Sequence, residues 1–78
     1  MENIRTIKTT KDLGVALREA RERSGLTQAK VAALCRVGTR FISDLENGKP
    51  TIQLAKALHV LGSLGMAMII KPREFGRD

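Results

Sequence analysis

Residues 26–49 constrain the fold more than any other part of this chain. Thr27 is a suitable N-cap for a helix over about residues 28–35, because its hydroxyl can accept a hydrogen bond from a free backbone N–H of the first turn. Within that helix, Val31 and Leu34 have the spacing of inward-facing residues. The segment therefore begins with a short helix that has one buried face.

A second short helix is predicted directly after it. Residues 36–38 form the turn, and the helix covers about residues 39–46, with Ile42 and Leu45 buried. Asn-Gly at 47–48 ends it. Two short helices joined by a tight turn, the second with polar side chains at its open start, can present that helix to the major groove of DNA. The pattern favours a sequence-specific DNA-binding protein.

One further helix is predicted before this pair. Thr9 or Thr10 can cap it, Asp12 suits its first turn, and Gly25 ends it. Its apolar residues recur with helical spacing at Leu13, Ala16, Leu17 and Ala20.

A fourth helix is predicted after the pair, opening at Pro50 and Thr51 and stopped by Gly65. Gly62 weakens it. Its apolar face is expected to consist of Leu54, Leu58, Leu61 and Leu64.

The last apolar stretch is short and is predicted to be a β-strand, because Gly65 precedes it and Lys71-Pro72 follow it. It consists of Met66, Ala67, Met68, Ile69 and Ile70. A lone strand cannot satisfy its own backbone donors and acceptors, so it must pair. In so helical a chain, the expected partner is the same strand of a second copy. Pairing within one chain stays open.

These elements predict one small, mainly α domain. The chain divides into an N-terminal arm (1–9), a helix-turn-helix domain (10–65), a dimerisation strand (66–71) and a tail (72–78). A core of this size supplies only about 3–5 kcal/mol of net stability, so a partner subunit is expected.

The charge balance indicates a polyanionic partner. Lys and Arg number 14 against 8 Asp and Glu, which gives a net charge of +6. Nucleic acid is the first candidate for such a surface, although solubility alone is the simpler explanation. The chain has two Phe and no Trp or Tyr. This scarcity of aromatic rings argues against single-strand binding by base stacking and against an RNA-recognition sheet.

Other classes of protein find little support in the sequence. A single Cys35 excludes an intrachain disulfide and a zinc finger. No apolar run approaches the roughly 18 residues of a membrane span, and we expect a cytoplasmic protein without membrane contact. No phosphate-binding Gly-rich loop and no metal-spaced cluster occurs, and the one histidine, His59, has apolar neighbours. We therefore expect no enzyme activity, no metal and no cofactor.

Several of these residues together resemble the helix-turn-helix of the Cro and phage-repressor family, also called the xenobiotic-response-element family. They are Thr27-Gln28, Ala32, Val37, Ile42-Ser43 and Leu45-Glu46-Asn47-Gly48-Lys49. The resemblance covers about residues 11–64 and implies a lambda-repressor-like domain of four or five helices. Two positions depart from the pattern: Arg36 stands where Gly is common in the turn, and Gly38 where Ser or Thr commonly caps the second helix. Arg36 would have to adopt a left-handed conformation.

The wider layout, with an arm, helical pieces and a terminal hydrophobic strand, looks like the HipB-type antitoxins. This resemblance implies that residues 66–70 pair across a homodimer and that the partner is a HipA-type Ser/Thr kinase toxin.

The residues expected at DNA fall into two groups. Gln28 would contact a phosphate at the start of its helix, as its family counterpart does; being only a helix former is the alternative. Base edges are expected to meet the outward side of helix 39–46, at Thr39, Arg40, Phe41, Ser43 and Asp44. Phosphates are expected at Asn47, Lys49 and Thr51.

Arg40 is the preferred base reader, because its planar fork matches the two major-groove acceptors of guanine; a phosphate contact is the alternative. Thr39 could hydrogen-bond a base or a phosphate, and Ser43 could do the same or only face solvent. Phe41 could contact a thymine methyl or pack against the first helix or the arm. Asp44 could accept from the amino group of cytosine or orient Arg40.

The resemblance also implies an ion pair between Arg21 and Glu46. We interpret it as structural, fixing the angle of helix 39–46.

The sequence thus predicts a dimeric repressor of a two-fold-symmetric DNA operator. Within that class we expect a HipB-like antitoxin that represses its own operon and binds a HipA-like kinase toxin. The alternatives are a stand-alone prophage-type repressor and a protein-interaction module that has lost DNA binding.

Overall fold

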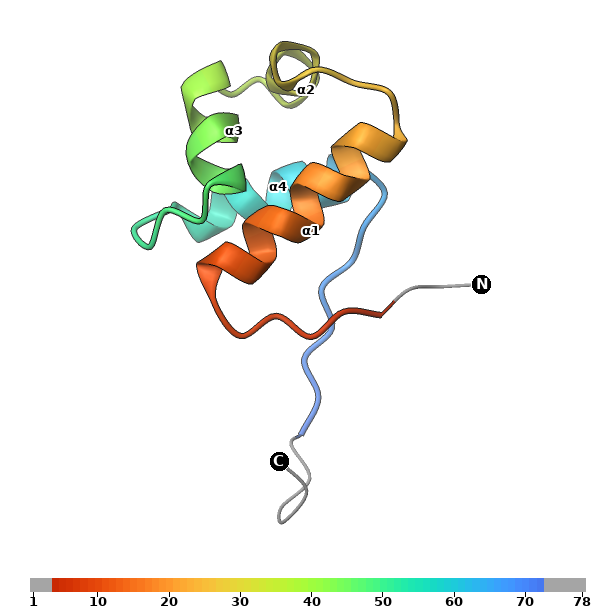
Figure 1. Cartoon of the computed structure of the whole chain (residues 1–78), viewed down its shortest axis with the longest axis vertical. Helices are drawn as coiled ribbons and strands as arrows, with labels where there is room; N and C mark the ends of the chain where they lie inside the picture. Colours follow the sequence, from red (N-terminus) through yellow and green to blue (C-terminus); the bar gives the residue numbers. More distant parts are fainter. Residues whose placement is uncertain (1–3, 73–78) are drawn as a thin grey trace.

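The computed structural model describes residues 4–72 and has four α-helices joined by short loops. They are α1 (Thr10–Arg23), α2 (Gln28–Cys35), α3 (Thr39–Glu46) and α4 (Leu54–Ser63) (Figure 1). The mainly α, lambda-repressor-like fold is as predicted. Residues 1–3 of the expected arm and 73–78 of the expected tail lie outside the described residues.

Local capping defines both ends of α1. The Thr9 hydroxyl accepts from the backbone N–H of Asp12 at 3.0 Å, and the Asp12 carboxylate accepts from the backbone N–H of Thr9 at 3.2 Å. These reciprocal bonds satisfy two of the N–H groups that a helix start leaves free. At the other end, Gly25 has a φ of 70°, the left-handed conformation that commonly follows a helix.

All four helices contribute to one apolar core. Its largest fully buried side chains are Leu17, Val31, Cys35, Ile42, Leu45 and Val60. One inward prediction was wrong: Leu34 is 67% exposed. The face of α2 that meets the core is instead formed by Val31, Ala32 and Cys35. Because both Val31 and Ala32 are buried, the face is centred between these two positions, and Cys35 lies over it one turn later. Leu34 lies to one side of this face.

The fourth helix also differs from its prediction. It begins at Leu54, with Gln53 as N-cap, because residues 49–52 form a separate turn closed by an Ile52 N–H bond to the Lys49 carbonyl. Its buried residues are Ala57, Val60 and Leu61, whereas Leu54 and Leu58 are 57% and 43% exposed. Small Ala57 lies fully buried on the contact side, so the two exposed leucines are turned away from the core.

The helices α1 and α3 approach closely at two glycines. A Cβ on Gly14 would lie 2.5 Å from the Leu45 carbonyl oxygen, and one on Gly48 would lie 2.6 Å from the Cα of Lys11. The Thr10 hydroxyl also donates to the Gly48 carbonyl at 2.8 Å. The first half of α1 is thereby fixed against the end of α3.

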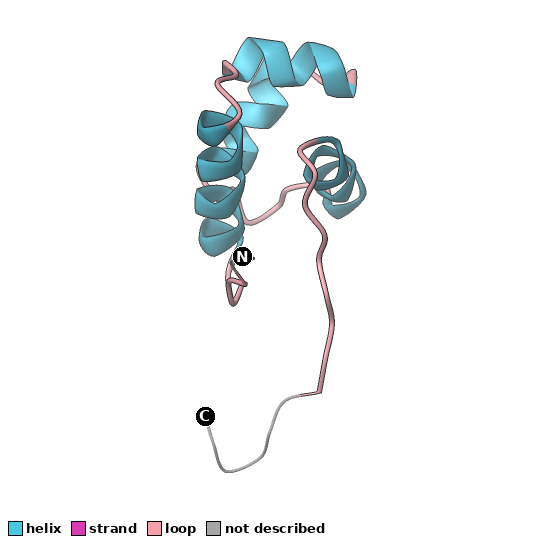
Figure 2. Ribbon diagram, turned by 90° about the vertical axis from the view of Figure 1, so that its right-hand side faces the viewer, coloured by secondary structure: helices cyan, strands magenta, loops and turns pink. Residues whose placement is uncertain are grey.

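The predicted C-terminal strand does not form within this chain. Met66 packs against the core, but the residues after it leave the helices without a β-ladder (Figure 2). The described arm and this segment cross in Figure 1 but lie apart in Figure 2, and no backbone hydrogen bond joins residues 4–9 to 66–72. A strand needs a partner for its backbone groups, and residues 4–72 provide none. Pairing between two copies stays a prediction.

Candidate nucleic-acid interface

The turn between α2 and α3 contains the left-handed residue that was expected at Arg36. Arg36 has φ 59° and ψ 43°, which is left-handed, and it is the C-cap of α2. The Val37 N–H closes the turn on the Ala32 carbonyl at 3.0 Å. Gly38 is the N-cap of α3 and offers no side-chain cap. No side-chain hydrogen bond therefore caps the first N–H groups of α3.

The helix α3 has a buried face and an open leading edge. Ile42 and Leu45 are each only 1% exposed, which holds the helix against α1 and α2. Thr39 and Arg40 in its first turn are exposed, and the Arg40 side chain is 90% accessible. Ser43 is half-buried. The predicted base-reading residues thus differ in exposure, and the Arg40 side chain is almost fully accessible to solvent.

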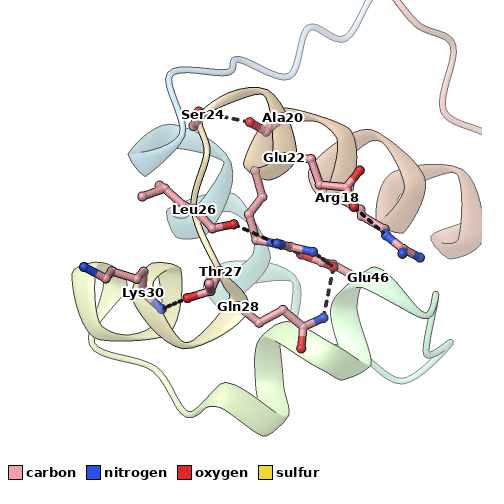
Figure 3. A network of polar contacts seen from close by, with 10 residues as sticks. Arg18, Ala20, Glu22, Ser24, Leu26, Thr27, Gln28, Lys30 and Glu46 are labelled. Carbon is pink, nitrogen blue, oxygen red and sulfur yellow. Dashed lines mark hydrogen bonds and ion pairs between the residues drawn. The ribbon is translucent and has the colours of Figure 1, made fainter.

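A partly buried polar network connects this helix to its neighbours. The Glu46 carboxylate accepts from Arg21 through Nε at 2.6 Å and Nη2 at 3.0 Å, and these side chains are only 5% and 12% exposed. Arg21 Nη1 donates to the Leu26 carbonyl at 2.8 Å. The hydrogen bonds that Arg21 donates to Glu46, together with the charge of that carboxylate, raise the pKa of Arg21 above its ordinary value, although burial opposes this. The end of α1, the start of α2 and the end of α3 are joined at one point (Figure 3).

Gln28 belongs to the same network. Its amide nitrogen donates to Oε1 of Glu46 at 3.0 Å (Figure 3). A primary amide has two N–H groups, so one is left for an outside acceptor. Sequence reasoning expected the phosphate contact but missed this contact to Glu46, because the two residues lie in different helices.

Asp44 lies between two cations. Its Oδ1 is 3.7 Å from Nε of Arg40, and its Oδ2 is 3.4 Å from Nζ of Lys49. The side chain of Asp44 is 26% exposed, against 50% for Lys49. One of the two sequence-based alternatives for Asp44 involved Arg40; the pairing with Lys49 was missed. A surface hollow adjoins the three-residue cluster and is lined by Phe41, Asp44, Lys49, Thr51, Ile52 and Gln53.

Phe41 is half-buried and packs against the core, with Nζ of Lys56 5.7 Å from its ring centroid. The sequence left open a contact with a thymine methyl or packing against the first helix or the arm, and it did not indicate the contact with Lys56 of α4. Asn47 and Thr51 are exposed on either side of Lys49. The loop from Asn47 to Thr51 therefore offers polar groups beside the end of α3.

Comparison with known proteins decides the family. The model of a helix-turn-helix domain matches residues 12–64. The chain is also 46% identical over 69 residues to y4mF of Sinorhizobium fredii, described as an uncharacterized HTH-type transcriptional regulator, covering 87% of this chain and 91% of that protein. The chain belongs to the helix-turn-helix family of transcriptional regulators.

Solved structures of HipB have the same fold as this regulator. A HipB variant in complex with an O2 20mer superposes with a TM-score of 0.83 at 25% identity, over 92% of this chain and all of the other. HipB in a complex with HipA, O2 and O3 superposes with a TM-score of 0.82 at 24% identity, over 91% of this chain and all of the other.

The one histidine and the one cysteine of the regulator both have structural contacts. His59 Nε2 lies 2.9 Å from the Cys35 carbonyl oxygen, which joins α4 to the end of α2, and Cys35 itself is buried. Within residues 4–72, no cluster of three potential metal ligands occurs. In the same part of the chain, no helix combines the length and the apolar character that crossing a bilayer requires.

Proposed function

We propose that this regulator represses transcription by binding a two-fold-symmetric DNA operator as a homodimer. The observation that carries the proposal is the open leading edge of α3, where Arg40 is 90% accessible while the helix is held by the buried Glu46 network. A rigid helix with an exposed start can place side chains against base edges in the major groove.

Within this proposal, contacts divide by what they recognise. Arg40 reads guanine, and Thr39 and Ser43 support it at neighbouring bases or phosphates. The phosphate contacts come from Gln28, Asn47, Lys49 and Thr51. Such contacts hold the protein in register without reading sequence.

The second copy is proposed to cover the apolar C-terminal segment. Met68, Ile69 and Ile70 are 43%, 76% and 94% exposed, and Leu54 and Leu58 of α4 are exposed as well. Pairing of residues 66–70 between two copies would satisfy their backbone groups and bury these side chains. The two copies of α3 would then meet half-sites about 34 Å apart.

We further propose that the regulator is an antitoxin of HipB type. The proposal is supported by the match to HipB structures over 91–92% of this chain and all of the HipB chain, including a structure in which HipB is complexed with HipA. On this basis a HipA-like kinase toxin is its protein partner, and the operator lies before their shared operon. A kinase-like gene next to the regulator's own gene supports this, whereas neighbouring phage genes support a stand-alone repressor.

A salt-dependent gel-shift assay with the promoter DNA tests the DNA-binding part. Arg40→Ala should relax base preference. Lys49→Ala should weaken binding to cognate and random duplexes alike, and it should reduce by about 0.9 the slope of log affinity against log salt concentration. Arg23→Ala, which removes the same charge from the last residue of α1, is the matched control and should change little.

No specific shift at low salt would contradict operator binding and favour a protein-interaction module. Equal losses on cognate and random DNA for Arg40→Ala would contradict its base-reading role alone. Co-purification with the neighbouring kinase-like protein tests the antitoxin part independently.

A further inference from the structure

The cluster of Asp44, Arg40 and Lys49 places a carboxylate in the middle of the proposed DNA-facing surface. The carboxylate is within 3.7 Å of one cation and 3.4 Å of the other, and it is the least exposed of the three side chains. Its backbone is tied to the same loop, because the Lys49 N–H donates to the Asp44 carbonyl at 3.0 Å. A negative charge this close to both cations of the proposed DNA-facing surface must affect what that surface binds.

We propose that Asp44 is a specificity-determining residue that competes with DNA phosphates for Arg40 and Lys49; this inference rests on the proposed function. Non-specific binding is driven by cations that neutralise phosphates and release counterions. Cations already paired with a carboxylate gain less from a phosphate, and the carboxylate repels the backbone. Asp44 therefore weakens binding to DNA of any sequence.

The same pairing leaves base recognition possible. Asp44 approaches Arg40 at Nε, which is the inner nitrogen of the guanidinium group. The two terminal nitrogens keep their N–H groups for the O6 and N7 acceptors of guanine. Arg40 can thus read a base while still paired, so Asp44 lowers random binding more than cognate binding.

Asp44→Asn tests this on the full-length protein. Fluorescence anisotropy measures its affinity for a random-sequence duplex and for a duplex selected from a random pool with the wild-type protein. Affinity for the random duplex should rise about 3- to 10-fold, because up to two exposed ion pairs no longer compete. Affinity for the selected duplex should rise less, so the ratio of the two affinities falls, and the salt slope on random DNA should steepen.

Two further variants isolate the effect. Glu22→Gln removes the same charge from the Arg18–Glu22 pair on α1, where the pair is exposed and 3.3 Å apart, and should leave the affinity ratio unchanged. Combining Asp44→Asn with Lys49→Ala should reduce the gain on random DNA, because one of the two released cations is then missing.

Three results separate the possibilities. Equal effects of Asp44→Asn and Glu22→Gln would overturn the proposal in favour of net charge alone. A loss confined to the selected duplex, with altered preference at one base pair, would overturn it in favour of direct base reading by Asp44. Failure of the wild-type protein to bind either duplex would instead contradict the proposed function.

Discussion

Single residues at the ends of helices carry most of the polar chemistry that orients α3. Glu46 is the main one, since its carboxylate accepts from both Arg21 and Gln28 with only 5% of its side chain exposed. A buried charge that loses its partner keeps its desolvation cost without compensation. The exposed pair of Arg18 and Glu22 has no such cost, because water already solvates both groups.

Glu46→Ala should lower the free energy of unfolding by about 3–5 kcal/mol, because it leaves the Arg21 guanidinium buried without a counter-charge. Urea denaturation followed by circular dichroism measures this. Gln28→Ala is the milder variant and should cost about 1.5–3 kcal/mol, the range for a hydrogen bond to a charged group. Glu22→Ala should cost no more than about 0.5 kcal/mol; a loss equal to that of Glu46→Ala would show that the network is not buried in solution.

Asp12 makes stability depend on pH. Hydrogen bonds from the backbone N–H groups of Lys8 and Thr9 hold its pKa below the ordinary value of 3.8, the bond from Lys8 contributing most. A folded-state pKa below the unfolded one means stabilisation that is present above pH 3.8 and lost as the pH falls through the folded-state value.

Asp12→Asn should therefore lower the Tm at neutral pH. The difference in Tm between this variant and the wild type should narrow below pH 3.8, and thermal melts across this pH range measure it. Thr9→Ala, which removes the capping hydroxyl, should lower the Tm with a weaker dependence on pH. A constant gap for Asp12→Asn at all pH values would mean that its charge contributes nothing to folding.

At the scale of elements, the contact between α1 and α3 depends on the absence of side chains. A Cβ on Gly14 would lie within 2.6 Å of two backbone carbonyl oxygens at the end of α3, whereas nothing lies within 4 Å of a Cβ on Gly62 in α4. Both glycines are inside helices. They therefore differ in tertiary contact while sharing the same weak helix propensity.

Alanine at these two glycines should have opposite effects. Gly14→Ala should destabilise by about 1–3 kcal/mol, because backbone cannot give way as a side-chain end can. Gly62→Ala should stabilise by about 0.8–1 kcal/mol through helix propensity. Chemical denaturation compares the two, and stabilisation by Gly14→Ala would mean that α1 and α3 are less close than the structure has them.

At the scale of the whole molecule, the described residues leave one apolar segment without a covering surface. Ile69 and Ile70 are 76% and 94% exposed, on a chain whose core comes from four short helices. Small domains gain little from burial alone, and an unpaired apolar strand is a site of association. A dimer would complete both the core and the DNA-binding surface.

Deletion of residues 66–70 should give monomers by light scattering after size-exclusion chromatography. Operator affinity should then fall by about 10²- to 10⁴-fold, because the second half-site no longer binds intramolecularly. Ile4→Asp removes an equally exposed apolar side chain, 83% accessible, from the arm and should remain dimeric. An unchanged mass after the deletion would contradict the strand-mediated dimer.

The sequence by itself determined the local boundaries. The bounds of α2 and α3 and the left-handed Gly25 follow from caps and glycines within a few residues of each helix end, whereas the left-handed conformation of Arg36 was expected from the family resemblance. These signals act through neighbouring backbone groups, so no distant residue is needed to read them. The contact of Arg21 with Glu46 was expected only from the family resemblance.

Only the tertiary structure decided which faces and charges meet. It turned Leu34 and Leu58 outward, closed α1 on α3 at Gly14, and placed Asp44 between two cations. Each of these outcomes depends on the position of another helix or loop, which periodicity along one helix does not contain. The reason is physical: hydrogen bonds at helix ends are local, whereas packing and ion pairing depend on atoms that the fold brings together.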